Sequence, residues 1–460
     1  MTKLLCSILT IIVISPLQAT TTRLKSMGNL QIAIDDNTNK IDLFNFGNNP
    51  CGLFCNEDTS IVDLDILYGE ESSKTDTITG DTTYTTFGNA IPYDLLEFIP
   101  TYSSAFFQYL PFPALPTNRL FYVKRSTSEK PDIWGNIPKK QAVGFLVTYG
   151  RLNQKFSDGK ESAGGPTIAL IYDMLFTSNL HLGFEGGYIY TGYNGDQEFE
   201  KATLSDINLT PAVAFVPNPS ITIGAKVDYH HPSVTFGTGD NELSYSGNAV
   251  NFSLSTIGNF INYLEVGALV GYKILSAKEE NDNFSLKGLD VRLKPRYSLP
   301  NFPLTIGGLM DIKKSAMLNS SENGDTIYQN EYSRILFGGG PILDMKYFLF
   351  GFEYIFSSLN EKERFIDRDS TKTFTNTFRI GGEIRPYNFL NLRGGYEFAK
   401  EKEREPGNRE IVSKTIGTGF GVLLKNLVID ACYNRIEKEE VDIKKTIKDN
   451  LYIISIRYIY

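Results

Sequence analysis

The stretch GLDVRLKPRYS, residues 288–298, alternates charged and apolar side chains along its length. The charged positions are Asp290, Arg292, Lys294 and Arg296. The apolar positions are Leu289, Val291, Leu293, Pro295 and Tyr297. Successive side chains of a β-strand point to opposite faces, so this period of two predicts a strand. A soluble sheet would turn the apolar face to a core, whereas a transmembrane barrel would turn it to lipid.

The connections between such strands favour the barrel. From about residue 141, tight turns rich in Asn, Gly and Pro, such as Gly258-Asn259 and Tyr387-Asn388, alternate with long polar connections. The polar connections include 194–202, 277–283, 359–371 and 400–410. Short turns at one end and long loops at the other are typical of outer-membrane barrels. The apolar faces run about ten residues, close to what a tilted strand needs to cross the hydrocarbon.

The carboxy terminus points the same way. The apolar face of the last strand holds Tyr452, Ile454, Ile456, Tyr458 and Tyr460. This pattern resembles the carboxy-terminal signal of bacterial outer-membrane barrels, which implies the barrel-assembly machinery and outer-membrane lipid as partners. The sequence therefore predicts an all-β protein, a transmembrane antiparallel up-and-down β-barrel of about sixteen strands. Adding 61–68 and 120–124 would give eighteen, and fourteen follows if a later pair does not span.

The amino terminus resembles a secretory signal peptide. Lys3 precedes an apolar run from Leu4 to Ile14, and Ala19 offers a cleavage site. Processing would remove one Lys and no acid, so the net charge of −8 would become −9. This acidic balance argues against a nucleic-acid partner, which requires a basic surface. The sequence thus predicts a signal peptide at 1–19 and export to the cell outer membrane.

Residues 20–58 carry the motifs Asp35-Asp36 and Asn49-Pro50-Cys51-Gly52-Leu53. These resemble the amino-terminal region of the FadL-like family of outer-membrane long-chain fatty-acid transporters and their relatives. In that family an acidic pair leads into Asn-Pro-Ala-Gly-Leu, and the segment folds into the barrel as a hatch. The resemblance implies a hatch that contains Asn49, Pro50 and Gly52. An ordinary turn before the first strand is the alternative, and Cys51 and Cys55 either form a disulfide or remain thiols.

Residues 59–140 hold the first strands and an apolar stretch, 91–116, with five prolines, and 141–460 form the main barrel. The prolines leave room only for short helices in that stretch. In the FadL-like family an outer hydrophobic groove captures the substrate. The resemblance therefore implies a hydrophobic small-molecule ligand at aromatic residues of this stretch, namely Phe98, Phe106, Phe107, Tyr109 and Phe112. A loop that plugs the lumen is the alternative.

Catalytic signatures are lacking in the sequence. The three histidines, His181, His230 and His231, accompany no nucleophile elbow and no metal-ligand pair, so we expect neither catalysis nor a metal or cofactor. The expected lumen charges are Asp290, Arg292, Lys294, Arg296, Arg379, Glu383, Arg385, Arg393 and Glu397. They predict either an ion-paired wall or a charged conduit. The favoured function is passage of small, hydrophobic molecules through a hatch-gated lumen; the alternatives are a general porin or a non-transporting structural or secretion-associated barrel.

Overall fold

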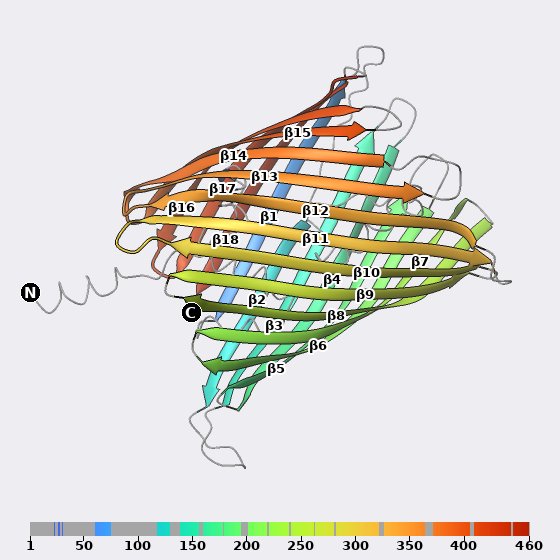
Figure 1. Ribbon diagram of the computed structural model, residues 1–460, viewed down its shortest axis with the longest axis horizontal. Helices are drawn as coiled ribbons and strands as arrows, with labels where there is room; N and C mark the ends of the chain where they lie inside the picture. Colours follow the sequence, from blue (N-terminus) through green and yellow to red (C-terminus); the bar gives the residue numbers. More distant parts are fainter. Residues whose placement is uncertain are drawn as a thin grey trace, which may run out of the picture.

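The computed structural model describes eighteen β-strands and a few residues near the amino terminus (Figure 1). The described residues are 23, 26, 27, 30, 60–74, 117–128, 139–155, 160–177, 179–194, 201–218, 220–238, 241–261, 263–279, 282–321, 326–363, 371–404, 409–442 and 445–459. None of the helical segments in these ranges is long and apolar enough to cross a membrane.

The strands follow one another along the chain without intervening helices in the described ranges. Their bounds are β1 Ile61–Lys74, β2 Thr117–Ser128, β3 Lys139–Lys155, β4 Lys160–Thr177, β5 Leu180–Asn194, β6 Lys201–Asn218, β7 Ile221–Thr238, β8 Asn241–Ile261, β9 Leu264–Glu279, β10 Asp282–Ser298, β11 Leu304–Ser321, β12 Thr326–Asp344, β13 Phe348–Glu363, β14 Thr371–Tyr387, β15 Leu390–Arg404, β16 Glu410–Leu424, β17 Leu427–Glu440 and β18 Lys445–Ile459.

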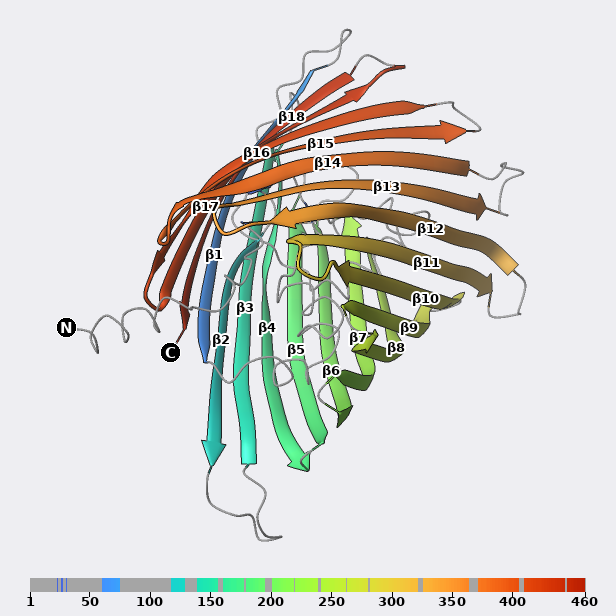
Figure 2. The same cartoon turned by 60° about the vertical axis from the view of Figure 1, so that its left-hand side comes forward.

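The strands pair in the order of an up-and-down barrel. Each strand from β2 to β17 pairs antiparallel with the strands before and after it. β1 pairs with β2 on one side and with β18 on the other, so the pairing runs around a ring (Figure 2). The expected sixteen strands from residue 141 onward correspond to β3–β18. β1 and β2 complete the sheet, so sixteen is too low for the whole barrel and eighteen is right.

The two faces of the sheet have opposite chemistry. In β13, the aromatic side chains of Phe350, Phe352 and Tyr354 are exposed on one face, while Glu353 is buried on the other. In β18, Tyr452, Ile454 and Tyr458 are exposed as the sequence predicts, while Ser455 and Arg457 at the alternate positions are buried. Side chains on the inner face of a barrel are shielded by the wall, whereas those on the outer face are bare. The strands are 12 to 21 residues long, longer than the ~9–11 that a membrane span needs.

The two ends of the barrel differ less than the sequence suggests. At the end where β1 begins and β18 ends, several turns are tight, and Tyr263, Asn301 and Lys425 adopt positive φ there. At the other end, the polar segment 277–283 is mostly strand, because β9 reaches Glu279 and β10 begins at Asp282. The polar segments 359–371 and 400–410 also continue their strands, through Glu363 and Arg404. The ladders therefore continue beyond the apolar part of these strands into their charged ends.

The ladders on the two sides of β1 are unequal. β1 and β18 are paired at fourteen positions, from Ile61 opposite Ile459 to Lys74 opposite Thr446. β1 and β2 are paired at only five, between Ile61 and Asp65 of β1 and the facing residues of β2. The β1–β2 ladder is the shortest among the described strands.

Candidate functional site

Glu383 is a fully buried carboxylate on the inner wall, near the tight-turn end of β14. The alternation along β14 turns Ile384 outward, where its side chain is 61% exposed, and turns Glu383 inward, where 1% remains exposed. Arg393 of β15 stands directly opposite Glu383 in the ladder. A buried carboxylate requires compensating charge and hydrogen bonds, because removing it from water is costly. The groups around Glu383 must therefore compensate its negative charge.

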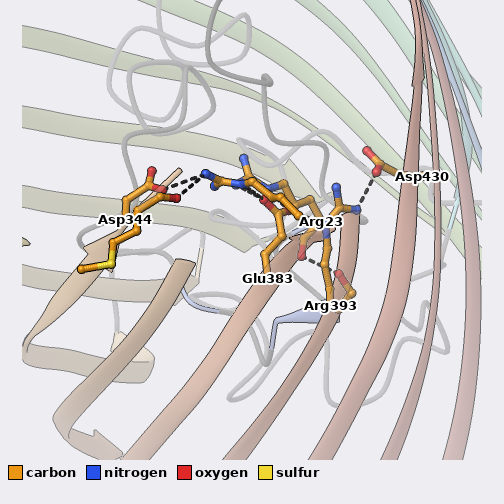
Figure 3. A network of polar contacts seen from close by, with 8 residues as sticks. Arg23, Asp344, Glu383, Arg393 and Asp430 are labelled. Carbon is orange, nitrogen blue, oxygen red and sulfur yellow. Dashed lines mark hydrogen bonds and ion pairs between the residues drawn. The ribbon is translucent and has the colours of Figure 1, made fainter. Parts of the chain in front are cut away.

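Three arginines surround Glu383 (Figure 3). Nε of Arg393 donates to Oε2 at 2.7 Å, and Nε of Arg385 donates to Oε1 at 2.8 Å. Arg23, from the amino-terminal segment, donates through Nε to Oε2 at 3.0 Å and through Nη2 to Oε1 at 3.2 Å. This two-point contact is the geometry in which a guanidinium binds a carboxylate most strongly.

Two further carboxylates extend the network along the wall. Nη1 of Arg385 donates to Asp344 at 2.9 Å, and Nη1 of Arg393 donates to Asp430 at 2.5 Å. The network therefore contains three guanidinium groups and three carboxylates, which balance when all are ionised. Without Arg23, the four wall residues and Glu383 would carry a net charge of −1. Arg23 is thus the counter-charge supplied from outside the sheet.

Arg23 belongs to a helical turn that rests on the inner wall. The backbone N–H of Met27 donates to the carbonyl oxygen of Arg23 at 3.3 Å, and the hydroxyl of Ser26 donates to the same oxygen at 2.7 Å. Met27 and Leu30 are fully buried and form an apolar cluster with Ile342 and Leu349. The segment is therefore held by both an ion pair and apolar contacts.

Two glycines of the wall make room for this turn. A Cβ at Gly381 of β14 would collide with the carbonyl oxygen of Met27. A Cβ at Gly419 of β16 would lie 2.7 Å from the Cβ of Ser26, closer than side-chain carbons approach. Because neither glycine carries a side chain, the backbone of the amino-terminal turn can lie directly against the sheet.

The charges predicted on β10 lie on the inner face and form cross-strand pairs. Asp290 is 3.6 Å from Nζ of Lys313, Arg292 is 3.7 Å from Asp311, and Arg296 is 3.8 Å from Glu265. Lys294 is half-buried on the same face. The sequence missed Asp311, which also accepts a hydrogen bond from Arg334 at 3.2 Å. This part of the wall is ion-paired.

The remaining predicted charges lie farther along β14 and β15. Nε of Arg379 donates to Glu397 at 2.7 Å, and its Nη1 is 3.6 Å from Glu353. Arg379 stands opposite both acids in the ladders of β13–β14 and β14–β15. These residues do not join the Glu383 network through any ion pair among the described residues.

A second buried polar group lies on β6–β8. Nδ1 of His230 is 2.7 Å from Asp206, and Nζ of Lys226 is 2.7 Å from Asp228. Asp228 also accepts a hydrogen bond from Asn251 at 2.9 Å. Within the described residues, no three His, Cys, Asp or Glu side chains are grouped as a metal site would require.

Several predicted sites lie outside the described residues. These are the hatch residues Asn49, Pro50 and Gly52, the cysteines Cys51 and Cys55, and the aromatic residues Phe98, Phe106, Phe107, Tyr109 and Phe112. The predictions for them stand as the sequence made them.

The sequence missed Arg23, Asp344 and Asp430. Asp430 had a usable signal, since Asp430, Cys432 and Asn434 alternate with outward-facing residues along β17. Asp344 ends β12 next to a turn, and Arg23 precedes the strands altogether, so alternation could not assign either of them.

Comparison with known proteins gives matches only among solved structures. No family model matches the sequence, and no curated protein matches it. A Pseudomonas aeruginosa FadL homologue aligns with 13% identity and a TM-score of 0.34, covering 95% of this chain and 98% of that one. The CymD monoaromatic hydrocarbon channel aligns with 12% identity and a TM-score of 0.35, covering 95% and 97%. Acinetobacter baumannii OccAB4 aligns with 11% identity and a TM-score of 0.39, covering 88% and 99%.

Proposed function

We propose that this chain is an outer-membrane channel for small molecules. The support is the chemistry of the two faces. Large apolar side chains such as Leu170 and Phe350 are bare on the outer face, which suits lipid. Acids such as Asp206, Asp228 and Glu353 are buried on the inner face and are ion-paired there, which suits a polar lumen. Antiparallel strands joined in a ring pair nearly all of their edges, as a sheet in hydrocarbon requires, and the short β1–β2 ladder is the weakest part of that ring.

We further propose that the amino-terminal segment gates the lumen. The single observation that carries this proposal is the two-point ion pair between Arg23 and the buried Glu383. The described contacts of this segment, the Arg23–Glu383 ion pair and the packing of Met27 and Leu30, are not part of any strand ladder, so the segment can be displaced while the sheet stays paired. Displacement would also leave the wall with the net charge of −1 described above, so the displaced state should favour cations. We prefer this proposal to a structural barrel without transport, because a separate segment held on the inner wall is what a gate requires.

The nature of the passing molecule has two candidates. The resemblance to FadL-like proteins supports hydrophobic molecules, received at Phe98, Phe106, Phe107, Tyr109 and Phe112 and passed along the hatch around Asn49, Pro50 and Gly52. The ion-paired wall formed by Asp290, Lys313 and Asp311 supports small polar solutes instead. We favour hydrophobic molecules, with a general porin as the alternative. The exposed tyrosines of β18 support its recognition by the barrel-assembly machinery.

The test is single-channel conductance in planar bilayers. The wild-type chain is compared with a variant that lacks residues 20–55 and keeps the signal peptide. We expect low conductance from the wild type and large, stable openings from the deletion variant. Uptake of a radiolabelled long-chain fatty acid and of a neutral sugar by cells carrying each variant distinguishes the two candidate cargoes. Equal conductance of the two proteins would remove the gating proposal, and absence of conductance and uptake from both would remove the channel proposal.

A further inference from the structure

A hollow lies on the outer surface of β10–β13, near the ends of the strands that are far from the tight turns. Its volume is about 460 Å³, within the range of small-molecule sites. Leu289 on β10 and Phe337 on β12 are exposed, so alternation places nine of the twelve lining residues on the outer face. Gly288, Ser315 and Tyr332, which have the opposite parity, line the floor of the hollow from within the sheet. The residues that line it are Tyr272, Lys287, Gly288, Leu289, Lys314, Ser315, Ala316, Glu331, Tyr332, Ser333, Asn360 and Lys362.

The register explains how the hollow forms. Lys287 stands opposite Ala316, which in turn stands opposite Glu331. In the next outward-facing row towards the tight turns, Lys314 stands opposite Ser333. Small side chains at Ala316 and Ser333 therefore lie between longer ones on the neighbouring strands. Diagonal neighbours on a sheet are about 7–8 Å apart, so the ammonium groups of Lys287 and Lys314 can converge over this gap.

The hollow has an excess of positive charge. Lys287, Lys314 and Lys362 line it, and Glu331 is the one carboxylate among its lining residues. Within the described part of the chain, none of these lysines forms an ion pair, whereas Glu331 already accepts a hydrogen bond from Gln329 at 3.2 Å. If all four groups are ionised, the net charge of the lining is +2. Such a site attracts an anion with several acceptor oxygens.

The position of the hollow indicates where that anion comes from. The row towards the tight turns contains Ile312 and Ile335, and the next contains Phe337, which is 48% exposed. On β8 and β9, the two rows of the hollow continue as Phe252, Tyr272 and Ile274, all exposed and none charged. On β14 and β15, one row continues as Lys372 and Arg404. The lysines of the hollow therefore lie at the border of the apolar outer face. Lipid headgroups lie at this border when the apolar face is in a membrane.

We propose that this hollow binds the phosphorylated headgroup of an outer-leaflet glycolipid of the lipid A type. The phosphate would accept hydrogen bonds from Lys287, Lys314 and Lys362, and acyl chains would lie along Leu289 and Tyr272. The proposal rests on the outer-membrane location proposed above. In such barrels the short turns face the periplasm, so the end that carries the hollow meets the outer leaflet, where this lipid lies. The proposal is independent of gating, since the hollow and the Glu383 network share no residue.

The test is native mass spectrometry of the full chain in detergent, titrated with diphosphoryl lipid A. The variant Lys314→Gln/Lys362→Gln is compared with Lys346→Gln/Lys425→Gln, which loses the same charge in turns at the opposite end. We expect the first variant to bind lipid A at least about tenfold more weakly, since each lost contact is a charge-assisted hydrogen bond, and the second to bind like wild type. Phosphatidylcholine should bind equally to all three proteins.

Two outcomes would overturn the proposal. Equal lipid A affinity of the wild type and Lys314→Gln/Lys362→Gln would show that the hollow is not the site. Competition by inorganic phosphate at equal concentration would show that the site takes free phosphate rather than a lipid. Conductance is measured on the same samples, so the two proposals fail separately. If the channel proposal is wrong, no conductance is seen, but lipid A still binds in a lysine-dependent way. If the lipid proposal is wrong, conductance and the effect of the 20–55 deletion are still seen.

Discussion

The inner wall around Glu383 and the inner wall of β6–β8 both bury carboxylates, but they compensate them differently. One counter-charge of Glu383 comes from Arg23, 360 positions away in the chain and outside the sheet. Asp206 is compensated by His230, 24 positions away on the adjacent strand, and Asp228 by Lys226 on its own strand. A pair within neighbouring strands persists as long as the sheet does. A pair with a separate segment can be broken while the sheet stays intact, so the described contacts of the Glu383 wall are suited to switching.

The largest effect on this contrast is expected from Arg23→Ala. Removing one partner of a buried pair costs about 3 kcal/mol or more, here from the state in which the segment is docked. We therefore expect the ratio of open to closed channels to rise on the order of a hundredfold. Reversal potentials in a salt gradient should show a greater preference for cations, because the wall then carries an uncompensated negative charge.

Two variants control this experiment. Arg435→Ala removes an exposed arginine that pairs with Glu437 on the outer surface, and it should leave conductance unchanged. Glu383→Gln combined with Arg23→Ala should conduct like Arg23→Ala alone but without the added cation preference. An Arg23→Ala channel that stays closed would show that the ion pair does not hold the segment.

A smaller effect on gating is expected from Gly381→Ala. The new methyl group would collide with the carbonyl oxygen of Met27, so the turn has to move away from the wall while the arginine network remains. Channel openings should become several-fold more frequent. Gly394→Ala on β15 is the matched control, because a Cβ there meets nothing within 4 Å. Equal opening frequencies in the two variants would argue against direct contact between segment and sheet.

Asp206→Asn tests the other wall. The substitution takes a carboxylate from His230 inside the sheet, so we expect a loss of about 1–3 kcal/mol in stability and no change in conductance. The measurement is the temperature at which the folded, fast-migrating form disappears on a gel. A change in gating without a change in that temperature would mean that β6–β8 also contacts a moving segment.

The smallest effect is expected from Arg334→Gln on β12. Its side chain is 32% exposed and shares Asp311 with Arg292, so the ion pair is partly screened by water. The loss of stability should stay below about 1 kcal/mol, and conductance should not change. A loss as large as that of Asp206→Asn would show that partial exposure does not weaken an ion pair of the inner wall.

The sequence predicted what alternation encodes. Asp290, Glu383 and Arg393 were placed on the inner face because their strands keep a strict period of two, and all three side chains are buried in the structure. Arg23 was out of reach, because its role depends on a tertiary contact between a helical turn and a distant strand. The strand number was too low because the alternating part of β2 is short and is separated from β3 by a polar connection. The polar ends of β9 and β10 read as loop because charge at a strand end resembles a loop in composition.

The junction of β1 and β18 has a consequence for the order of folding. It joins side chains such as Asp65 and Ser455, which are 390 positions apart. Closing a loop of that length costs about 2–3 kcal/mol more entropy than closing a hairpin of about 20 residues, whereas each neighbouring pair of strands needs only a hairpin. Hairpins should therefore form first and this junction last, at a rate set by its long separation in the chain. Until then β1 and β18 are open edges. A chain cut short before residue 445 lacks β18, so β1 and β17 would remain as unpaired edges that are exposed to aggregation.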